Sequence, residues 1–286
     1  MLRMLMLAVL VAAPAAGRAP APDPVAADPP RDTAHPARMD VLHIPTGGVE
    51  INGVAYVAAG AGPHPTLVLC HGWPGNEKNL DLAQAVRRAG WNVVTFNYRG
   101  SWGSPGAFRF AQVPQDAAAV LAYLRRPEVA AKLAANPSRL VIGGHGMGGW
   151  ATALVAAADP ALKGAMLISA ANMGGIAGLP RADLIALSAG NAETLAGTSP
   201  GQMADELAAG REAFDSLAGA PGLARLPLLV LTSDDGLAPG ADALVAAVRR
   251  AGGTRVTTGH VATDHSWSDS RIALERRVIA WLRLLE

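Results

Sequence analysis

Three places along the chain carry residues that could do chemistry together. His265 follows the last predicted strand, and Asp234 and Asp235 follow the strand before it. Imidazole changes charge readily near neutral pH, so it suits proton transfer, and a nearby carboxylate could orient its ring. The third place is the glycine-rich corner at residues 143–149, between an apolar run and an alanine-rich run. These residue types indicate acid–base chemistry next to a sharp turn.

The elements that must position these residues follow from the hydrophobic pattern. Apolar runs alternate with stretches of helical spacing, which predicts an α/β fold with a mostly parallel, twisted sheet and helices on both faces. The predicted strands are residues 39–45, 49–58, 66–70, 91–98, 162–170, 226–232, 255–261 and the run from residue 139 into the corner. The predicted helices are residues 79–89, 113–126, 151–158, 240–251 and 271–285. Ligands of such sheets bind outside the carboxyl ends of the strands, so the site is expected there.

One segment breaks this rhythm. Residues 171–223 stand between two predicted strands and carry helical stretches at residues 181–192 and 202–217. Connections in such folds are usually a few residues long, so this insertion is expected to form a helical cap over the upper edge of the sheet. The alternative is plain helical packing on one face.

Bulk composition limits what the protein could bind. The chain has 286 residues, of which 50% are hydrophobic, and a formal net charge of +1. No basic cluster and no phosphate loop occurs, so neither nucleic acid nor a cofactor is predicted. No pair of histidines has metal-ligand spacing, so no metal is predicted either. The lone cysteine, Cys70, excludes an intramolecular disulfide and is expected to be a buried thiol.

The N-terminal residues predict an exported protein, either periplasmic or secreted. Residues 1–19 begin with Arg3, continue as a short apolar run and end in small residues, as a signal peptide does. The run is about 10 residues long against roughly 20 for a membrane-spanning helix, so no stable membrane insertion is expected after cleavage. Residues 20–38 are expected to form a linker rich in Pro and Ala, and residues 39–286 the domain.

Several motifs at the predicted strand ends together resemble the α/β-hydrolase superfamily. They are Leu69-Cys70-His71-Gly72-Trp73-Pro74-Gly75, Asn97-Tyr98-Arg99-Gly100, Gly144-His145-Gly146-Met147-Gly148-Gly149, Asp235-Gly236-Leu237-Ala238-Pro239 and Asp264-His265. The resemblance runs from about Val41 to the C-terminus and is similar to the bacterial esterase, dienelactone hydrolase and prolyl-oligopeptidase-like branches. It implies the α/β-hydrolase fold and hydrolysis of an ester or amide bond in a small molecule or short peptide.

The resemblance also implies which residues act as base and acid. His265 would be the general base and later the general acid, oriented by a carboxylate that follows the penultimate strand. The family places this carboxylate four residues before a proline, and Asp235 stands four before Pro239. Asp235 is therefore favoured over Asp234, and Asp264 comes third.

Two backbone groups would complete the site by resemblance. The N–H groups of Trp73 and Met147 would form an oxyanion hole, which stabilises the charge that develops on a carbonyl oxygen. The other histidines near the site, His71, His145 and His260, are expected to be structural.

The family pattern is broken at the centre of the corner. The resemblance puts the nucleophile at Gly146, on a strained strand-to-helix turn, but glycine has no heteroatom and cannot form an acyl-enzyme. The chain could be a relic or ligand-binding member of the fold. Alternatively, His265 and Asp235 could activate water directly, or an artificial change could have replaced the serine.

A substitute nucleophile would have to come from a neighbouring loop. Ser169 and Ser233 end neighbouring strands and Ser101 lies in a nearby loop, but none is predicted on a strained turn. The expected function is therefore that of an α/β-hydrolase related to serine esterases and peptidases, with weak or lost activity. A non-catalytic ligand-binding or scaffolding protein is the alternative. No oligomeric state is predicted.

Overall fold

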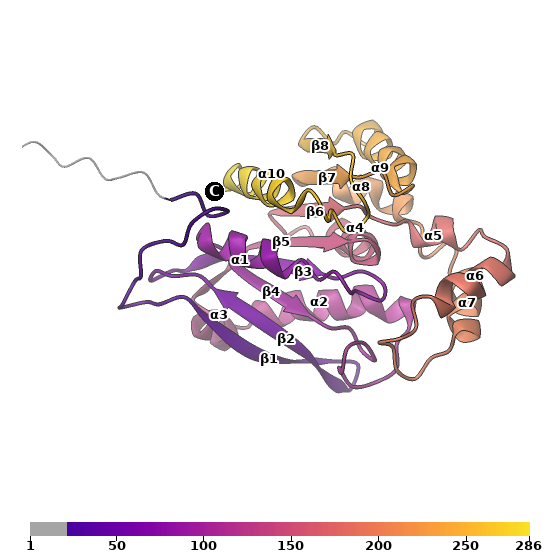
Figure 1. The fold of residues 1–286 in the computed structure, drawn as a ribbon, viewed down its shortest axis with the longest axis horizontal. Helices are drawn as coiled ribbons and strands as arrows, with labels where there is room; N and C mark the ends of the chain where they lie inside the picture. Colours follow the sequence, from indigo (N-terminus) through magenta and orange to yellow (C-terminus); the bar gives the residue numbers. More distant parts are fainter. Residues whose placement is uncertain (1–21) are drawn as a thin grey trace, which may run out of the picture.

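The predicted apolar runs pair into one eight-stranded sheet in the computed structural model, which describes residues 22–286 (Figure 1). The strand order is β1-β2-β4-β3-β5-β6-β7-β8. The β1–β2 and β2–β4 pairs are antiparallel, and all other neighbouring pairs are parallel. The predicted fold class is confirmed. The predicted signal peptide, residues 1–19, lies outside the described residues.

The bounds of the elements agree closely with the hydrophobic pattern. The strands are β1 (Arg38–Thr46), β2 (Val49–Val57), β3 (His64–Cys70), β4 (Asn92–Phe96), β5 (Ala135–His145), β6 (Gly164–Ile168), β7 (Leu228–Thr232) and β8 (Val256–His260). The α-helices are α1 (Leu80–Arg88), α2 (Val113–Leu124), α3 (Pro127–Lys132), α4 (Met147–Ala158), α5 (Met173–Ile176), α6 (Arg181–Ala189), α7 (Pro200–Ala209), α8 (Ala220–Leu223), α9 (Ala238–Arg250) and α10 (Arg271–Arg283). Two short 3-10 helices are η1 (Phe110–Gln112) and η2 (Ser216–Gly219). No helix among residues 22–286 has the length and hydrophobicity that crossing a bilayer requires.

Both faces of the sheet are buried, which explains why the central strands are mostly apolar and do not alternate with polar residues. Val68 of β3 joins the cluster that α2, α4 and α9 cover, whereas its neighbours Leu67 and Leu69 join the cluster under α1 and α10. Figure 1 shows α1 and α10 side by side over that second face. Successive side chains of a strand point to opposite faces, so each face needs its own helical layer.

The segment at residues 171–223 divides into two parts. Its final elements, η2 and α8, pack against α4 as an ordinary helical layer. Its earlier helices α5, α6 and α7 lie beyond the carboxyl edge of the sheet (Figure 1). There the segment pairs with the loop after β4: the Trp102 N–H donates to Thr194 (3.0 Å) and the Phe108 N–H donates to Ala196 (2.9 Å).

Two local predictions were wrong. The helix predicted at residues 202–217 ends at Ala209, because the chain reverses at Gly210, where Phe214 packs so closely that a Cβ would stand 2.1 Å from its ring. The short helix α3 was not predicted, since it has only 6 residues and too few turns to show a periodic pattern.

Glycines at the corner allow α4 to cross β3 and β5 at close range. A Cβ on Gly144 would stand 2.1 Å from the Gly148 carbonyl oxygen, and a Cβ on Gly148 would stand 2.2 Å from the Cys70 carbonyl oxygen. Real Cβ atoms do not approach backbone this closely. The start of α4 therefore sits where it does only because these positions lack side chains.

Gly148→Ala is expected to lower the free energy of unfolding by about 3 kcal/mol or more, because the added methyl group forces α4 away from β3. The matched control is Gly201→Ala in α7, where a Cβ would have no neighbour within 4 Å. That variant should be neutral or stabilised by up to about 1 kcal/mol. Urea denaturation of both variants measures the difference, and equal stabilities would contradict the close crossing.

Candidate active site

A sharp turn joins β5 to α4 and is made by Gly146 alone. Its φ of 57° and ψ of −120° lie where residues with a side chain are strained and glycine is not. Backbone hydrogen bonds hold the turn: the Gly146 N–H donates to Ile168 (3.1 Å), and its carbonyl accepts from Gly149 and Ala171 (both 3.0 Å). The corner thus has the sharp strand-to-helix shape that the sequence predicted.

A side chain on Gly146 would face His265. An ideal Cβ there would stand 3.1 Å from Nε2 and 3.4 Å from Cε1 of His265, and 3.8 Å from Cα of Gly72. The structure therefore brings together the elbow, the predicted base and the loop after β3, although these are far apart in the sequence.

The predicted acid and base form a hydrogen-bonded pair. Nδ1 of His265 lies 2.7 Å from Oδ2 of Asp235, and since a carboxylate only accepts, Nδ1 donates and Nε2 keeps its lone pair. Burial alone would raise the pKa of Asp235, but hydrogen bonds from His265 and from the Leu237 N–H outweigh it, and the pKa falls to about 2. Asp235 is therefore ionised in the folded protein near neutral pH.

The two rival carboxylates are bound elsewhere. Asp234 Oδ1 lies 3.0 Å from Nε2 of His260, whose Nδ1 lies 2.9 Å from the Thr232 hydroxyl. Asp264 accepts the N–H of Ser268 at 2.8 Å, so it orders its own loop. Of the three candidates, only Asp235 contacts His265.

The two predicted oxyanion donors flank the same space. Met147 is the first residue of α4, so its N–H has no acceptor within the helix. The Trp73 N–H follows Gly72, whose Cα borders the position of a residue-146 side chain. Among the described residues, no hydrogen bond uses either N–H group. The Trp73 ring packs edge-on against Phe110, at 5.0 Å between ring centroids, so its side chain serves packing.

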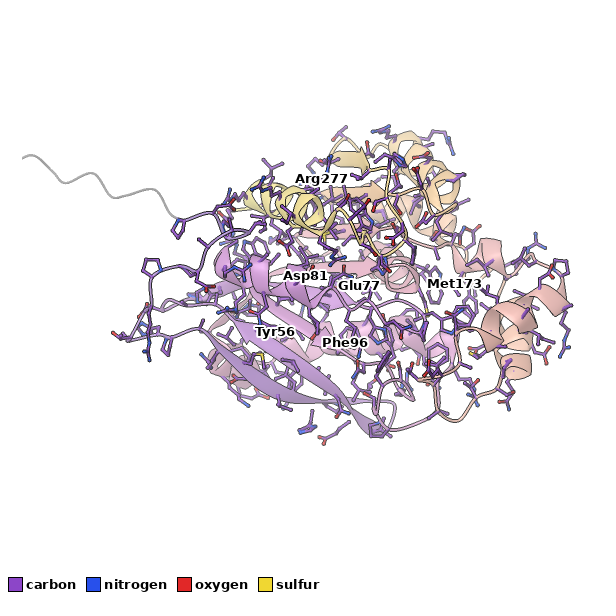
Figure 2. All side chains as sticks on the ribbon, in the orientation of Figure 1. Tyr56, Glu77, Asp81, Phe96, Met173 and Arg277 are labelled. Atoms are coloured by element: carbon purple, nitrogen blue, oxygen red, sulfur yellow. The ribbon has the colours of Figure 1, made fainter. Side chains whose placement is uncertain are left out.

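A small cavity opens beside His265. Its volume is about 160 Å³, and its walls are the loop at residues 72–77 together with His145, His265 and Ser266. No residue of the 171–223 segment lines it. Glu77 contributes a carboxylate to the wall, and Figure 2 shows it near Asp81 at the start of α1, where both carboxylates face Arg271.

The serines considered as substitute nucleophiles are buried. Ser101, Ser169 and Ser233 are each 1% exposed or less. Ser169 and Ser233 share a hydrogen bond of 2.8 Å, and the Trp267 indole N–H donates to Ser169 at 3.0 Å. Burial keeps all three side chains from meeting a substrate, and these hydrogen bonds also hold Ser169 and Ser233.

The same contacts reveal a network that the sequence did not predict. An indole N–H only donates and a carboxylate only accepts, so Trp267 donates to Ser169, Ser169 to Ser233, and Ser233 to Asp235, whose pKa it lowers. The one signal in the sequence was a serine after each of two neighbouring strands. The network holds the carboxylate that holds His265.

Two buried histidines support the loops of the site. His145 donates from Nε2 to the backbone oxygen of His265 (2.7 Å), and the two rings contact at a tilt of 40°, with 4.4 Å between centroids. His71 donates from Nδ1 to the backbone oxygen of Gly72 (2.8 Å). Burial lowers the pKa of each ring to about 4. Among residues 22–286 no three His, Cys, Asp or Glu side chains converge as a metal site.

The buried histidines predict a pH dependence of stability. Their folded pKa, about 4, lies below the ordinary value of 6.5, so the folded chain binds fewer protons than the unfolded chain between these values. The contribution of these histidines to the free energy of unfolding is therefore fully present above pH 7. It decreases as the pH drops towards 4, by about 3 kcal/mol for each histidine.

The measurement is the unfolding free energy from pH 7 to pH 4.5. His71→Asn and His145→Gln, which keep a donor near the original nitrogen, should each reduce its slope by up to about 1.4 kcal/mol per pH unit. His43→Asn on the exposed face of β1 is the control and should leave the slope unchanged. An unchanged slope in all three variants would show that other groups titrate.

Comparison with solved structures finds the same fold at low sequence identity. The chain is similar to an acylaminoacyl peptidase from Pyrococcus horikoshii (TM-score 0.62, 15% identity), with 86% of this chain and 41% of the peptidase covered. It is similar to a putative dienelactone hydrolase from Klebsiella pneumoniae (TM-score 0.57, 19% identity), with 86% of this chain and 98% of the hydrolase covered. It is also similar to a thermostable carboxylesterase cloned from a metagenomic library (TM-score 0.62, 22% identity), with 87% of this chain and 90% of the esterase covered. Such identities show the fold alone.

Comparison with curated proteins by sequence gives no significant match. A family model described as the alpha/beta hydrolase family, in contrast, matches residues 67–275, which is most of the chain. This range contains the loop after β3, the elbow, Asp235 and His265. The resemblance predicted from the motifs is confirmed: the chain belongs to the α/β-hydrolase family.

Proposed function

We propose that this chain is an α/β-hydrolase whose site binds the carbonyl group of a small ester or amide, or of a short peptide, but has lost acyl-enzyme catalysis. One observation carries the proposal. His265 Nε2 stands 3.1 Å from where a residue-146 side chain would begin, with Nδ1 bound to Asp235. The site thus keeps a directed base and two N–H groups, and lacks only the attacking atom.

The names of the structural neighbours support carbonyl substrates. A peptidase, a dienelactone hydrolase and a carboxylesterase share this fold. The cavity of about 160 Å³ beside His265 favours a small ligand or one short portion of a larger ligand.

Hydrolysis without a nucleophile is expected to be slow. Serine proteases that lose a triad member keep roughly 10³- to 10⁴-fold acceleration over water, through the oxyanion hole and binding. Any hydrolysis by this chain would depend on water activated by His265. Its rate should therefore lie far below that of a serine enzyme.

Gly146→Ser is expected to give the site a nucleophile. The new Cβ would crowd His265 Nε2 at 3.1 Å, but the His265 side chain is 44% exposed and can move by a few tenths of an ångström. The variant should react with a fluorophosphonate probe and hydrolyse p-nitrophenyl acetate at least about 10²-fold faster than wild type, with a burst.

Gly146→Ala is the matched control, because it brings the same Cβ and the same strained φ without a hydroxyl group. It should remain unlabelled and as slow as wild type. If Gly146→Ser folds, as judged by circular dichroism, yet neither reacts with the probe nor turns over ester, the roles proposed for His265 and the two N–H groups are wrong.

A further inference from the structure

The space that a residue-146 side chain would fill (the elbow space) has an unusual border. Its three nearest atoms are His265 Nε2 (3.1 Å), His265 Cε1 (3.4 Å) and the Gly72 Cα (3.8 Å). Only one of them is polar. A ligand group in the elbow space would therefore meet Nε2 directly, with two carbon atoms as its other near neighbours.

His265 presents a base to this space without an intermediary. Nδ1 donates to Asp235, so the Nε2 lone pair is free, and no hydrogen bond among the described residues uses it. In a serine hydrolase, the serine hydroxyl lies between the base and the ligand, and the base nitrogen accepts its hydrogen bond. Here a ligand atom can meet the imidazole directly.

An oxyanion hole and a base without a nucleophile make a different catalyst. The two N–H groups can stabilise negative charge on a carbonyl oxygen, whether that charge arises by attack on the carbonyl carbon or by loss of a proton from the adjacent carbon. The first route needs a nucleophile that Gly146 cannot supply. The second needs only the base.

We propose that His265 removes a proton from the carbon next to a carbonyl group bound by the N–H groups of Trp73 and Met147. This inference rests on the proposed carbonyl-binding function. The C–H bond breaks and its proton forms the Nε2–H bond. The electron pair becomes the C=C bond of an enolate, and the carbonyl π pair moves to oxygen. Proton return from Nε2 to the same or another carbon restores a carbonyl compound, so the step is an exchange or isomerisation.

The surroundings of His265 fit this step. Proton uptake leaves an imidazolium, and the ionised Asp235 at 2.7 Å compensates its charge. Asp235 does not depend on residue 146 for its position, since Ser233 and the Leu237 N–H also hold it. The base can therefore cycle between its two charge states without moving.

The cavity limits the substrate class. At about 160 Å³ it accepts a small molecule, and its lining residues include no Lys or Arg that could hold an anion. Imidazole is a moderate base, so the carbon acid must be activated. A neutral 1,3-dicarbonyl compound, such as a small β-keto ester, meets all three requirements.

The test follows two reactions of one substrate in the same sample. Wild-type protein is incubated with ethyl 2-methylacetoacetate in D₂O buffer, and ¹H NMR follows loss of the C2 proton signal and release of ethanol. Exchange should exceed the buffer rate by between about 10² and 10⁴-fold, the usual contribution of general base catalysis. Ethanol release should stay near the buffer rate.

Matched variants attribute the reaction to the site. His265→Gln and Asp235→Asn should lose exchange, while His260→Gln and Asp234→Asn, which alter the neighbouring exposed pair, should keep it. Gly146→Ser should exchange the C2 proton more slowly than wild type, because its hydroxyl separates Nε2 from the ligand. The same hydroxyl can attack the ester, so this variant should release ethanol faster than wild type.

Each outcome separates this inference from the proposed function. Exchange at the buffer rate overturns the inference; if ethanol release then depends on His265, or Gly146→Ser cleaves the ester, carbonyl binding stands. Exchange that survives His265→Gln overturns it too. A wild-type protein without exchange, together with an inert Gly146→Ser variant, overturns both.

Discussion

The hydrogen bond between His265 Nδ1 and Asp235 Oδ2 decides what this site can do. It fixes the tautomer, so that Nε2 is a base, and it fixes the direction in which that base points. The bond forms because β7 and β8 are neighbouring parallel strands whose following loops meet at one edge of the sheet. The Asp235 side chain is buried and ionised, whereas 44% of the His265 side chain is exposed, so only the ring is accessible from solvent.

The elbow persists without its nucleophile because its shape belongs to the backbone. Gly146 adopts a φ of 57° at little cost, whereas a serine would be strained there. The close approach of α4 to β3 depends on other positions, chiefly Gly144 and Gly148. The start of α4 is thus positioned by packing and not by residue 146. The geometry around residue 146 therefore does not require a side chain at that position.

The sheet was predicted from local signals in the sequence, whereas the pairing of Asp235 with His265 was expected from the family resemblance. Apolar runs gave the strands, and the four-residue spacing from Asp235 to Pro239 separated it from Asp234, which the structure places on His260. The network from Trp267 through Ser169 to Ser233 could not be predicted, because it joins residues 64 and 98 positions apart through side-chain packing. The cavity wall at residues 72–77 was not predicted either, because a loop has no periodic pattern from which its course could be inferred.

The persistence of the acid–base pair is not by itself evidence that it is used. Asp235 is held by a backbone N–H, the Ser233 side chain and His265, and packing alone could keep it in place. The exposure of His265 is a stronger indication. A purely structural histidine is expected to be buried, as His71 is at 3% exposure, with Nδ1 bound to the backbone oxygen of Gly72. His265 instead keeps 44% of its side chain exposed and turns its free nitrogen towards the elbow. Packing has no need of that arrangement, whereas proton transfer to a ligand requires it.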